Sequence, residues 1–227
     1  MYSELRSSTL LKSSISATVE YSDRMARGVV VRADKGEAIL AAALEVFGRD
    51  GFGDGKVEEI AKLAGAAKPT IYNRFGDKRN LFTQAVNYGV VRSGEHTIEA
   101  IDSINLQPGD IRAELERLGN DLVDCIAHDE GAAVIRLQLV ERPRFPDIID
   151  GDINRNRAID ALAGKLAQLS ATGYLRLNDP QRAARQFIAL VTEDALVRSG
   201  FGSRVLAPEE FDVTVRDGVD TFLAAFS

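Results

Sequence analysis

Residues 57–82 read VEEIAKLAGAAKPTIYNRFGDKRNLF, and this stretch decides the fold expected for the N-terminal part of the chain. Apolar residues recur at helical spacing over 57–64, Gly65 begins a tight turn, and residues 68–75 again have a helical pattern. Two short helices joined by a glycine-containing turn are typical of a helix-turn-helix unit. The helix that completes such a unit is predicted over residues 35–51, where apolar residues repeat every three or four positions.

The helix predicted over residues 68–75 has an apolar face and, opposite it, a face rich in hydrogen-bond donors. Ile71 and Phe75 lie four residues apart and should pack against the core. The donor-rich face carries Lys68, Thr70, Tyr72 and Asn73. Such a helix enters the major groove N-terminus first, so Lys68 can donate to guanine and Thr70 can bond a base edge. Each of these polar residues, taken singly, also fits an ordinary solvated surface position.

The residues at the ends of this helix fit its expected boundaries. Pro69 suits the first turn, and Gly76 suits the left-handed conformation that often follows the last turn. Asp77 can cap a further helix that runs toward Ser93.

The net charge of −6 is divided unevenly along the chain. Residues 24–80 hold 11 Lys and Arg against 8 Asp and Glu, whereas residues 81–227 hold 15 against 23. An acidic body cannot itself neutralise phosphate, so this division indicates two modules with different partners. Ordinary variation in surface charge is the alternative.

The rest of the chain also has helical periodicity, and nothing in it alternates as a strand would. Helices are predicted at 111–126, 134–140, 146–171, 180–199 and 208–226. The last two carry wide apolar stripes, which can pair with their copies in a second chain as a four-helix bundle. In the alternative arrangement, both stripes face the core of their own protomer.

Residues 38–82 resemble the DNA-binding domain of TetR-family transcriptional regulators. The resemblance rests on VEEIAKLAG at 57–65, KPTIYNRFGDK at 68–78, and Leu81 with Phe82. It implies that bases are faced by Lys68, Pro69, Thr70 and Tyr72. It also implies that phosphates are held by Asn73, Arg74 and Lys78. Phosphate contacts would set the register on the duplex, and base contacts would specify the sequence.

Two positions depart from the family pattern. Gly55 and Lys56 stand where the family usually has a Thr-Thr or Thr-Ser pair, so a capping oxygen is missing and Lys56 offers a charged phosphate contact instead. Ala67 stands where a serine commonly precedes the recognition helix, which leaves backbone N–H groups and the helix dipole to meet phosphate. A missing cap costs on the order of 1 kcal/mol of helix stability.

The C-terminal part resembles the C-terminal domain of the AefR-like subgroup of TetR regulators. The resemblance rests on ERPRFP at 141–146, on Gly173-Tyr174-Leu175 and on Asp179-Pro180. It implies a body that binds a small-molecule effector and forms a homodimer, which we place at helices 180–199 and 208–226. Candidate effector contacts are His128, Arg136, Gln138 and Glu141, and a surface position is the alternative for each.

These observations predict an all-α protein with three parts. A disordered N-terminal arm covers residues 1–32, a three-helix helix-turn-helix domain covers 33–80, and a larger helical effector-binding and dimerisation domain covers 81–227. The expected function is a sequence-specific, ligand-responsive repressor that binds a pseudo-palindromic operator as a dimer. In this mechanism the helix from Asp77 toward Ser93 connects the effector to the DNA. An all-helical protein that binds a small molecule without DNA activity is the alternative.

Other classes of function lack support in the sequence. It has no nucleophile motif and no glycine-rich phosphate loop, so we do not expect an enzyme. His128, Asp129 and Glu130 are sequential neighbours, which do not converge on one metal, so we expect no metal or other cofactor. With one cysteine, no secretory signal and no apolar run of about 20 residues, the chain is expected in the cytoplasm. Met25 would serve equally well as the start of the protein.

Overall fold

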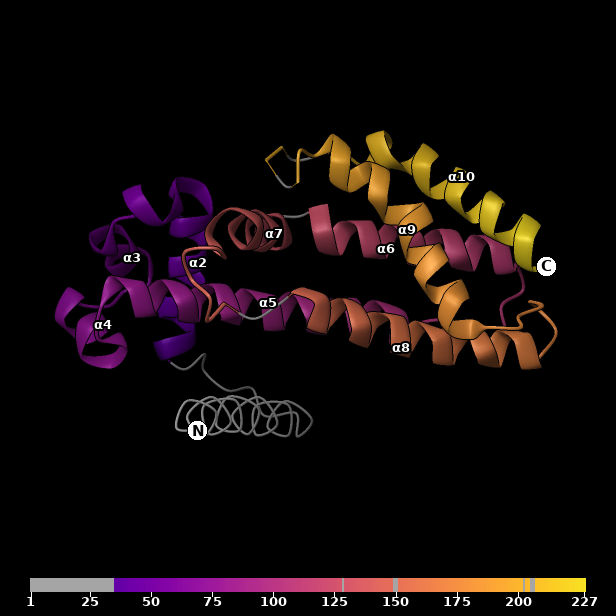
Figure 1. Cartoon of the computed structure of the whole chain (residues 1–227), viewed down its shortest axis with the longest axis horizontal. Helices are drawn as coiled ribbons and strands as arrows, with labels where there is room; N and C mark the ends of the chain where they lie inside the picture. Colours follow the sequence, from indigo (N-terminus) through magenta and orange to yellow (C-terminus); the bar gives the residue numbers. More distant parts are fainter. Residues whose placement is uncertain (1–34, 128, 149–150, 202, 205–206) are drawn as a thin grey trace, which may run out of the picture. The chain divides into compact units, whose positions relative to one another are not determined.

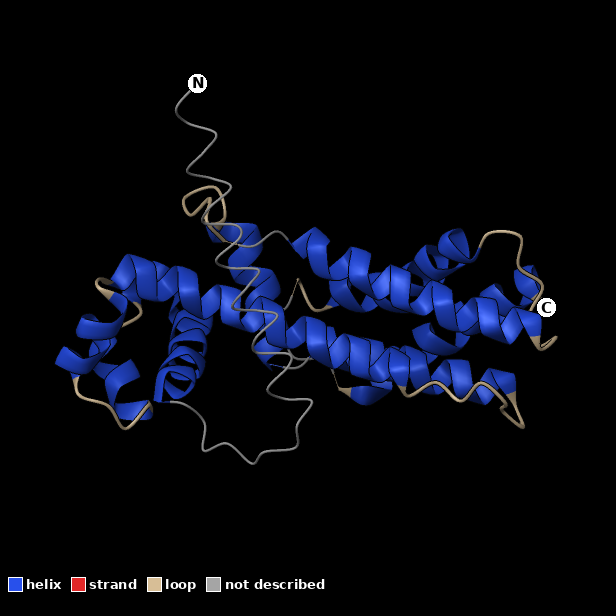
Figure 2. Cartoon of the chain, turned by 90° about the horizontal axis from the view of Figure 1, so that it is seen from below, coloured by secondary structure: helices blue, strands red, loops and turns tan. Residues whose placement is uncertain are grey.

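The computed structural model describes residues 35–127, 129–148, 151–201, 203–204 and 207–227. The predicted arm at 1–32, the alternative start at Met25 and the candidate effector contact His128 lie outside these residues. The described part consists of helices and connecting turns, with no strand (Figure 2). The prediction of an all-α fold is therefore confirmed.

The described residues form nine helices along the chain (Figure 1). They are α2 (Lys35–Asp54), α3 (Val57–Leu63), α4 (Lys68–Phe75), α5 (Lys78–Asp102), α6 (Ile111–Ala127), α7 (Asp129–Glu141), α8 (Gly151–Ala171), α9 (Pro180–Arg198) and α10 (Pro208–Phe226). Among these helices, none is long and apolar enough to cross a membrane.

The predicted helix boundaries agree with the structure to within about three residues except at α5, α7 and α8. The helix predicted toward Ser93 continues to Asp102 in α5, and the helix predicted at 134–140 begins at Asp129 in α7. For α8 the sequence predicts a start near Pro146, but the helix begins at Gly151. The residues before it form a turn, in which the Ile148 N–H donates to the Phe145 carbonyl at 3.1 Å. Phe145 is buried among other aromatic rings, so tertiary packing holds this segment out of the helix that the proline would favour.

A first buried cluster surrounds Phe47 of α2 and joins α2, α3, α4 and the first half of α5. It also takes in Val134 and Leu137 of α7, together with Phe145 and Ile148. The Phe145 ring lies 4.8 Å from the Phe52 ring and 4.5 Å from the Phe82 ring, measured between centroids. The core beneath the N-terminal helices therefore depends on residues that follow them by more than fifty positions.

A second buried cluster joins α6, α8, α9, α10 and the last turns of α5. Leu115, Leu118, Leu162, Leu166 and Phe187 are at its centre, and all are almost fully buried. In Figure 1, α5 and α8 lie side by side, and α9 packs against α8, α6 and α10. Because Phe82 belongs to the first cluster and Ile101 to the second, α5 passes through both.

The apolar stripes of α9 and α10 face the core of their own protomer. The stripe residues concerned are Phe187, Val191, Ala195, Phe211, Val215, Val219, Phe222 and Leu223, and all are buried in the second cluster. These buried residues match the alternative arrangement, in which the stripes face the core of their own protomer beside α6 and α8, and the homodimer through the two helices stays a prediction. Exposed apolar side chains in this region are Val197, Phe201 and Val213.

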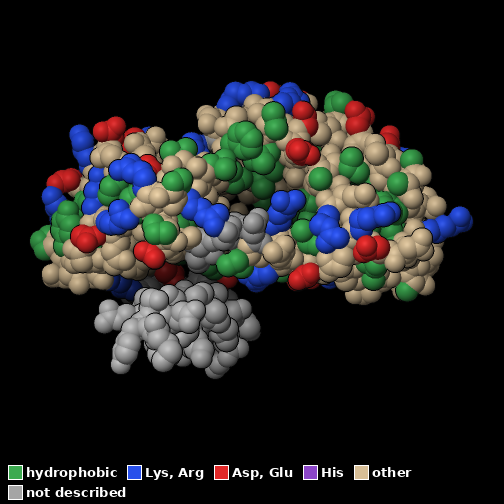
Figure 3. Space-filling model, in the orientation of Figure 1, with side chains coloured by type: hydrophobic (Ala, Val, Ile, Leu, Met, Phe, Trp, Pro, Cys, Tyr) green, Lys and Arg blue, Asp and Glu red, His purple; other side chains and the backbone are tan. Residues whose placement is uncertain are grey.

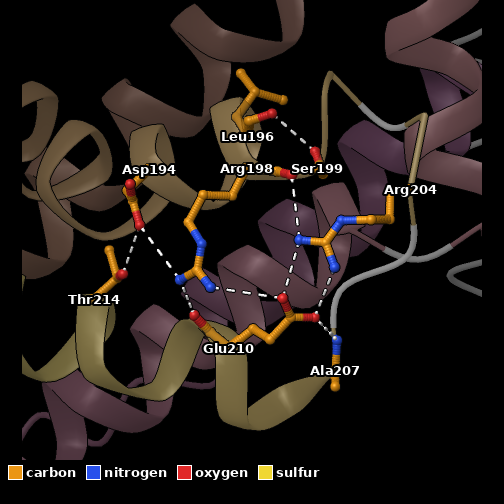
Figure 4. Close-up of polar contacts among 8 residues, drawn as sticks. All are labelled: Asp194, Leu196, Arg198, Ser199, Arg204, Ala207, Glu210 and Thr214. Carbon is orange, nitrogen blue, oxygen red and sulfur yellow. Dashed lines mark hydrogen bonds and ion pairs between the residues drawn. The ribbon is translucent and has the colours of Figure 1, made fainter.

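A network of exposed charged groups holds α10 to the end of α9 (Figure 4). The Glu210 carboxylate accepts from Arg204 at 3.0 and 3.1 Å and from the Ala207 N–H at 2.9 Å. Arg198 approaches Asp194 at 3.7 Å and Glu210 at 3.6 Å. Ala207 has no side-chain oxygen, so Glu210 makes only the half of a capping box in which the third helical residue reaches back.

Candidate DNA interface

Helices α3 and α4 are joined by the tight turn predicted at Gly65. Gly65 has φ +58°, and the Ala66 N–H donates to the Ala61 carbonyl at 2.9 Å. Gly76 has φ +80° directly after α4, and the Asp77 side chain accepts from the Asn80 N–H at 2.8 Å to cap α5. These turn and cap residues set the relative directions of α3, α4 and α5, as in a helix-turn-helix unit.

The two faces of α4 are as different in the structure as in the sequence. Ile71 is 1% exposed and Phe75 is 3% exposed, and both pack in the cluster that contains Ile39, Phe47 and Ile60. Tyr72, in contrast, is 37% exposed. Also exposed on α4 are Lys68, Pro69, Thr70, Asn73 and Arg74. The predicted separation of a core face from a donor-rich face is therefore confirmed.

Neither helix of the unit has a side-chain cap at its N-terminus. Lys56 occupies the capping position of α3, and Ala67 occupies that of α4, in each case without a capping hydrogen bond. The Lys56 side chain is exposed at the start of α3. Figure 3 shows Lys and Arg side chains spread over the α3 and α4 end of the molecule, interspersed with Asp and Glu.

Lys68 is engaged by two neighbours on the exposed face. Its ammonium forms an ion pair with Glu58 of α3 and lies 5.8 Å from the centre of the Tyr72 ring. The hydrogen bond between Lys68 and Glu58 lowers the pKa of the glutamate and raises the pKa of the lysine. Sequence reasoning missed Glu58, which lies in the first turn of α3, ten residues before Lys68.

Two of the residues proposed to hold phosphate are also packed within the protein. The Lys78 ammonium donates to the Gly53 carbonyl at 3.0 Å and lies 5.0 Å from the centre of the Phe52 ring. The Arg74 guanidinium lies close to Gly36 in the first turn of α2. Both cations therefore also join α2 to the neighbouring helices, while their role toward DNA stays a prediction.

Segment 142–148, between α7 and α8, lies against the start of α5. Arg79 donates to the Arg144 carbonyl at 2.7 Å, and its guanidinium lies 4.4 Å from the centre of the Phe145 ring. Asn87 donates to the Asp147 carbonyl at 3.1 Å. The ERPRFP motif thus contacts the first turn of α5, the helix that follows α4.

The described candidate effector contacts are all on α7, which packs against α2, α5 and α6. Arg136 donates to the Gly48 carbonyl of α2. Glu141 is buried and forms an ion pair with Arg144 at 3.3 Å. Gln138 is half-buried. Arg136 and Glu141 therefore lie where α7 meets α2 and segment 142–148, and their contact with an effector stays a prediction.

Two family models match the chain. Residues 39–85 match the model described as bacterial regulatory proteins of the tetR family. Residues 113–227 match the model described as the C-terminal domain of AefR-like transcriptional repressors. The second match alone covers half of the chain.

Relatives and solved structures agree with these matches. The chain is 28% identical to a DNA-binding transcriptional repressor TetR of Mycobacteroides abscessus, over 70% of this chain and 90% of that one. A TetR-family regulator from Mesorhizobium loti has a TM-score of 0.76 at 23% identity, covering 87% of this chain and 99% of that one. The flavonoid-responsive regulator FrrA has a TM-score of 0.60 at 26% identity, covering 85% of this chain and 97% of that one.

Proposed function

Because the chain belongs to the TetR family of DNA-binding transcriptional regulators, with a C-terminal domain of the AefR-like kind, we propose that it is a ligand-responsive repressor that binds a pseudo-palindromic operator as a homodimer. The observation that carries this proposal is the orientation of α4, which buries Ile71 and Phe75 and leaves its donors exposed. The relatives are transcriptional regulators rather than enzymes.

In this proposal, α4 enters the major groove and α3 crosses the phosphate backbone. Base contacts come from Lys68, Pro69, Thr70 and Tyr72, and phosphate contacts come from Lys56, Asn73, Arg74 and Lys78. The exposed positions of Lys56 and of the residues on α4 support this assignment. Lys78 and Arg74 would have to share their charge between DNA and the packing contacts that they already make.

The proposed dimer uses α9 and α10. Since the apolar stripes of these helices are already covered, the surface left for a second copy is the outer face, where Val197 and Val213 are each 57% exposed. Two recognition helices about 34–36 Å apart would meet successive major grooves on one side of the duplex. A single eight-residue recognition helix makes too few contacts for specific binding, which also favours a dimer.

The proposed effector is a mostly apolar small molecule. The likeness to a flavonoid-responsive regulator supports this class of ligand. Figure 3 shows a hollow lined by apolar side chains in the region where α6 and α7 approach each other. Sites for small ligands are mostly apolar with a few polar groups that orient the ligand.

Helix α5 is the proposed connection between effector and DNA. With 25 residues it is about 37 Å long at 1.5 Å per residue, and its two ends lie in different buried clusters. A ligand that favours one arrangement of the second cluster can therefore shift the position of α4. A typical coupling of about 1–3 kcal/mol changes operator affinity roughly 5- to 150-fold.

A DNA-binding titration over a range of salt concentrations tests the proposal. The probe is the DNA upstream of the protein's own gene, and fluorescence anisotropy reports binding. Tight binding that weakens steeply with salt is expected, because phosphate neutralisation releases counterions. A monomer by light scattering at micromolar concentration would contradict the dimer. A protein that binds a small molecule but no DNA would support the alternative function.

A further inference from the structure

A carboxylate lies within the face that is proposed to meet DNA. Glu58, in the first turn of α3, has 65% of its side chain exposed and pairs with Lys68, the first residue of α4. Lys68 is also the only Lys or Arg between residues 67 and 73, the part of the recognition helix nearest the bases. The cation that would contribute most at this end of α4 is therefore held by a negative charge.

This ion pair affects the two kinds of DNA binding differently. Non-specific binding depends on the number of phosphates that Lys and Arg neutralise. Glu58 cancels the charge of Lys68 for this purpose, and its own charge is repelled by the DNA backbone. Each neutralised phosphate steepens the slope of log affinity against log salt by about 0.9, which is roughly eightfold in affinity between 1 M and 0.1 M salt.

The ion pair lowers the affinity for a specific operator less than the affinity for other DNA, because a lysine ammonium has three N–H donors. One donor can stay with Glu58 while the others reach guanine O6 and N7. Glu58 and the Tyr72 ring together restrict where the Lys68 ammonium can lie. A donor that is already oriented pays less conformational entropy when it binds a matching base.

We infer that Glu58 is a specificity-determining residue that acts through Lys68, by suppressing non-specific DNA binding more than operator binding. This inference rests on the proposed DNA-binding function. It predicts that losing the carboxylate charge makes the protein bind DNA more tightly but less selectively.

The test compares Glu58→Gln with Glu59→Gln. The two glutamates are neighbours in the first turn of α3, so both variants lose the same charge from the same helix end. Glu59, however, pairs with Arg49 at 2.8 Å and not with a residue of α4. Affinities are measured by anisotropy for a duplex selected by the wild-type protein from a random pool, and for a scrambled duplex of the same composition.

At about 0.1 M salt we expect Glu58→Gln to raise the affinity for the scrambled duplex about five- to tenfold and to change that for the selected duplex by less than about twofold. For Glu59→Gln the ratio of the two affinities should stay within about twofold of wild type. In a Lys68→Met background, Glu58→Gln should still relieve the repulsion between its charge and the DNA, but it should change the ratio of the two affinities no more than Glu59→Gln does. Because Glu58 is exposed, thermal unfolding of the variant should match that of the wild type.

Three results would overturn the inference: an unchanged ratio of the two affinities in Glu58→Gln, an equal change of this ratio in Glu59→Gln, or a change of the ratio by Glu58→Gln that persists without Lys68. A wild-type protein that does not prefer its selected duplex would overturn the proposed function and this inference together. A wild-type protein that is selective, combined with an unchanged Glu58→Gln variant, would overturn the inference alone.

Discussion

Replacing Phe145 by alanine should destabilise the helices that present α4 to DNA. The Phe145 side chain is 1% exposed, and its ring packs against the rings of both Phe52 and Phe82. The guanidinium of Arg79 lies 4.4 Å from the centre of the same ring. The substitution removes the ring from both aromatic neighbours and from the cation, and leaves a cavity in the first cluster.

The expected loss of unfolding free energy is about 3 kcal/mol. Truncating a buried phenylalanine usually costs about 3–5 kcal/mol, including the transfer of the ring and the cavity that remains. We expect the lower end of this range because segment 142–148 is not helical and can move toward the cavity. With a urea slope of about 3 kcal/mol per molar, the midpoint of unfolding should fall by about 1 M.

The assay is urea unfolding followed by circular dichroism at one fixed protein concentration, because the stability of a dimer depends on concentration. Phe226→Ala is the matched control, since Phe226 is half-buried near the C-terminus and its ring contacts Phe222 at 4.8 Å. Phe226→Ala should lower the free energy of unfolding by about 1 kcal/mol. A loss of less than 1 kcal/mol for Phe145→Ala, or equal losses in the two variants, would refute the view that segment 142–148 is part of the first core.

Three further predictions concern a helix cap, a helix contact and a titrating group. Ala67→Ser supplies the missing cap of α4, so it should raise unfolding free energy by about 1 kcal/mol or tighten operator binding, and no change in either would show that the cap is irrelevant here. Gly48→Ala should lower the free energy of unfolding by about 1–3 kcal/mol, because the added carbon would lie 2.7 Å from the Ala133 side chain. Gly53→Ala is the control: its added carbon meets no atom within 4 Å, so it should be neutral or slightly stabilising in the same denaturation assay. Hydrogen bonds from Arg204 and from the Ala207 N–H lower the pKa of Glu210, so its stabilising effect is present above the ordinary pKa of glutamate and is lost as the pH falls through the lowered value. The thermal midpoint of Glu210→Gln should therefore lie below that of wild type at neutral pH, and the two midpoints should converge in acid. A difference between the midpoints that does not change with pH would contradict this linkage.

Local signals predicted the helix-turn-helix unit closely. The positions of Gly65, Gly76 and Asp77 gave the turn, the end of α4 and the cap of α5, and the structure has each of them. The spacing of Ile71 and Phe75 gave the buried face of α4. These predictions succeeded because turn geometry, capping and helical periodicity act among residues that are close in sequence.

Predictions that depended on the partner of an apolar stripe were less successful. The stripes of α9 and α10 show only that one face is covered, and periodicity has the same form whether the cover is α6 or a second chain. The interpretation of Pro146 as a helix start failed for a related reason, since the burial of Phe145 against Phe52 and Phe82 outweighs a local preference.

The amino-acid sequence alone predicts an all-α protein with a recognition helix at residues 68–75, and it resembles one family in both its N-terminal and its C-terminal part. The folded arrangement adds contacts that no spacing rule contains: Arg136 with the Gly48 carbonyl, Phe145 with Phe52 of α2 and Phe82 of α5, and Glu58 with Lys68. Each of these joins separate helices, and the choice among possible partners depends on how all the helices share one packed interior.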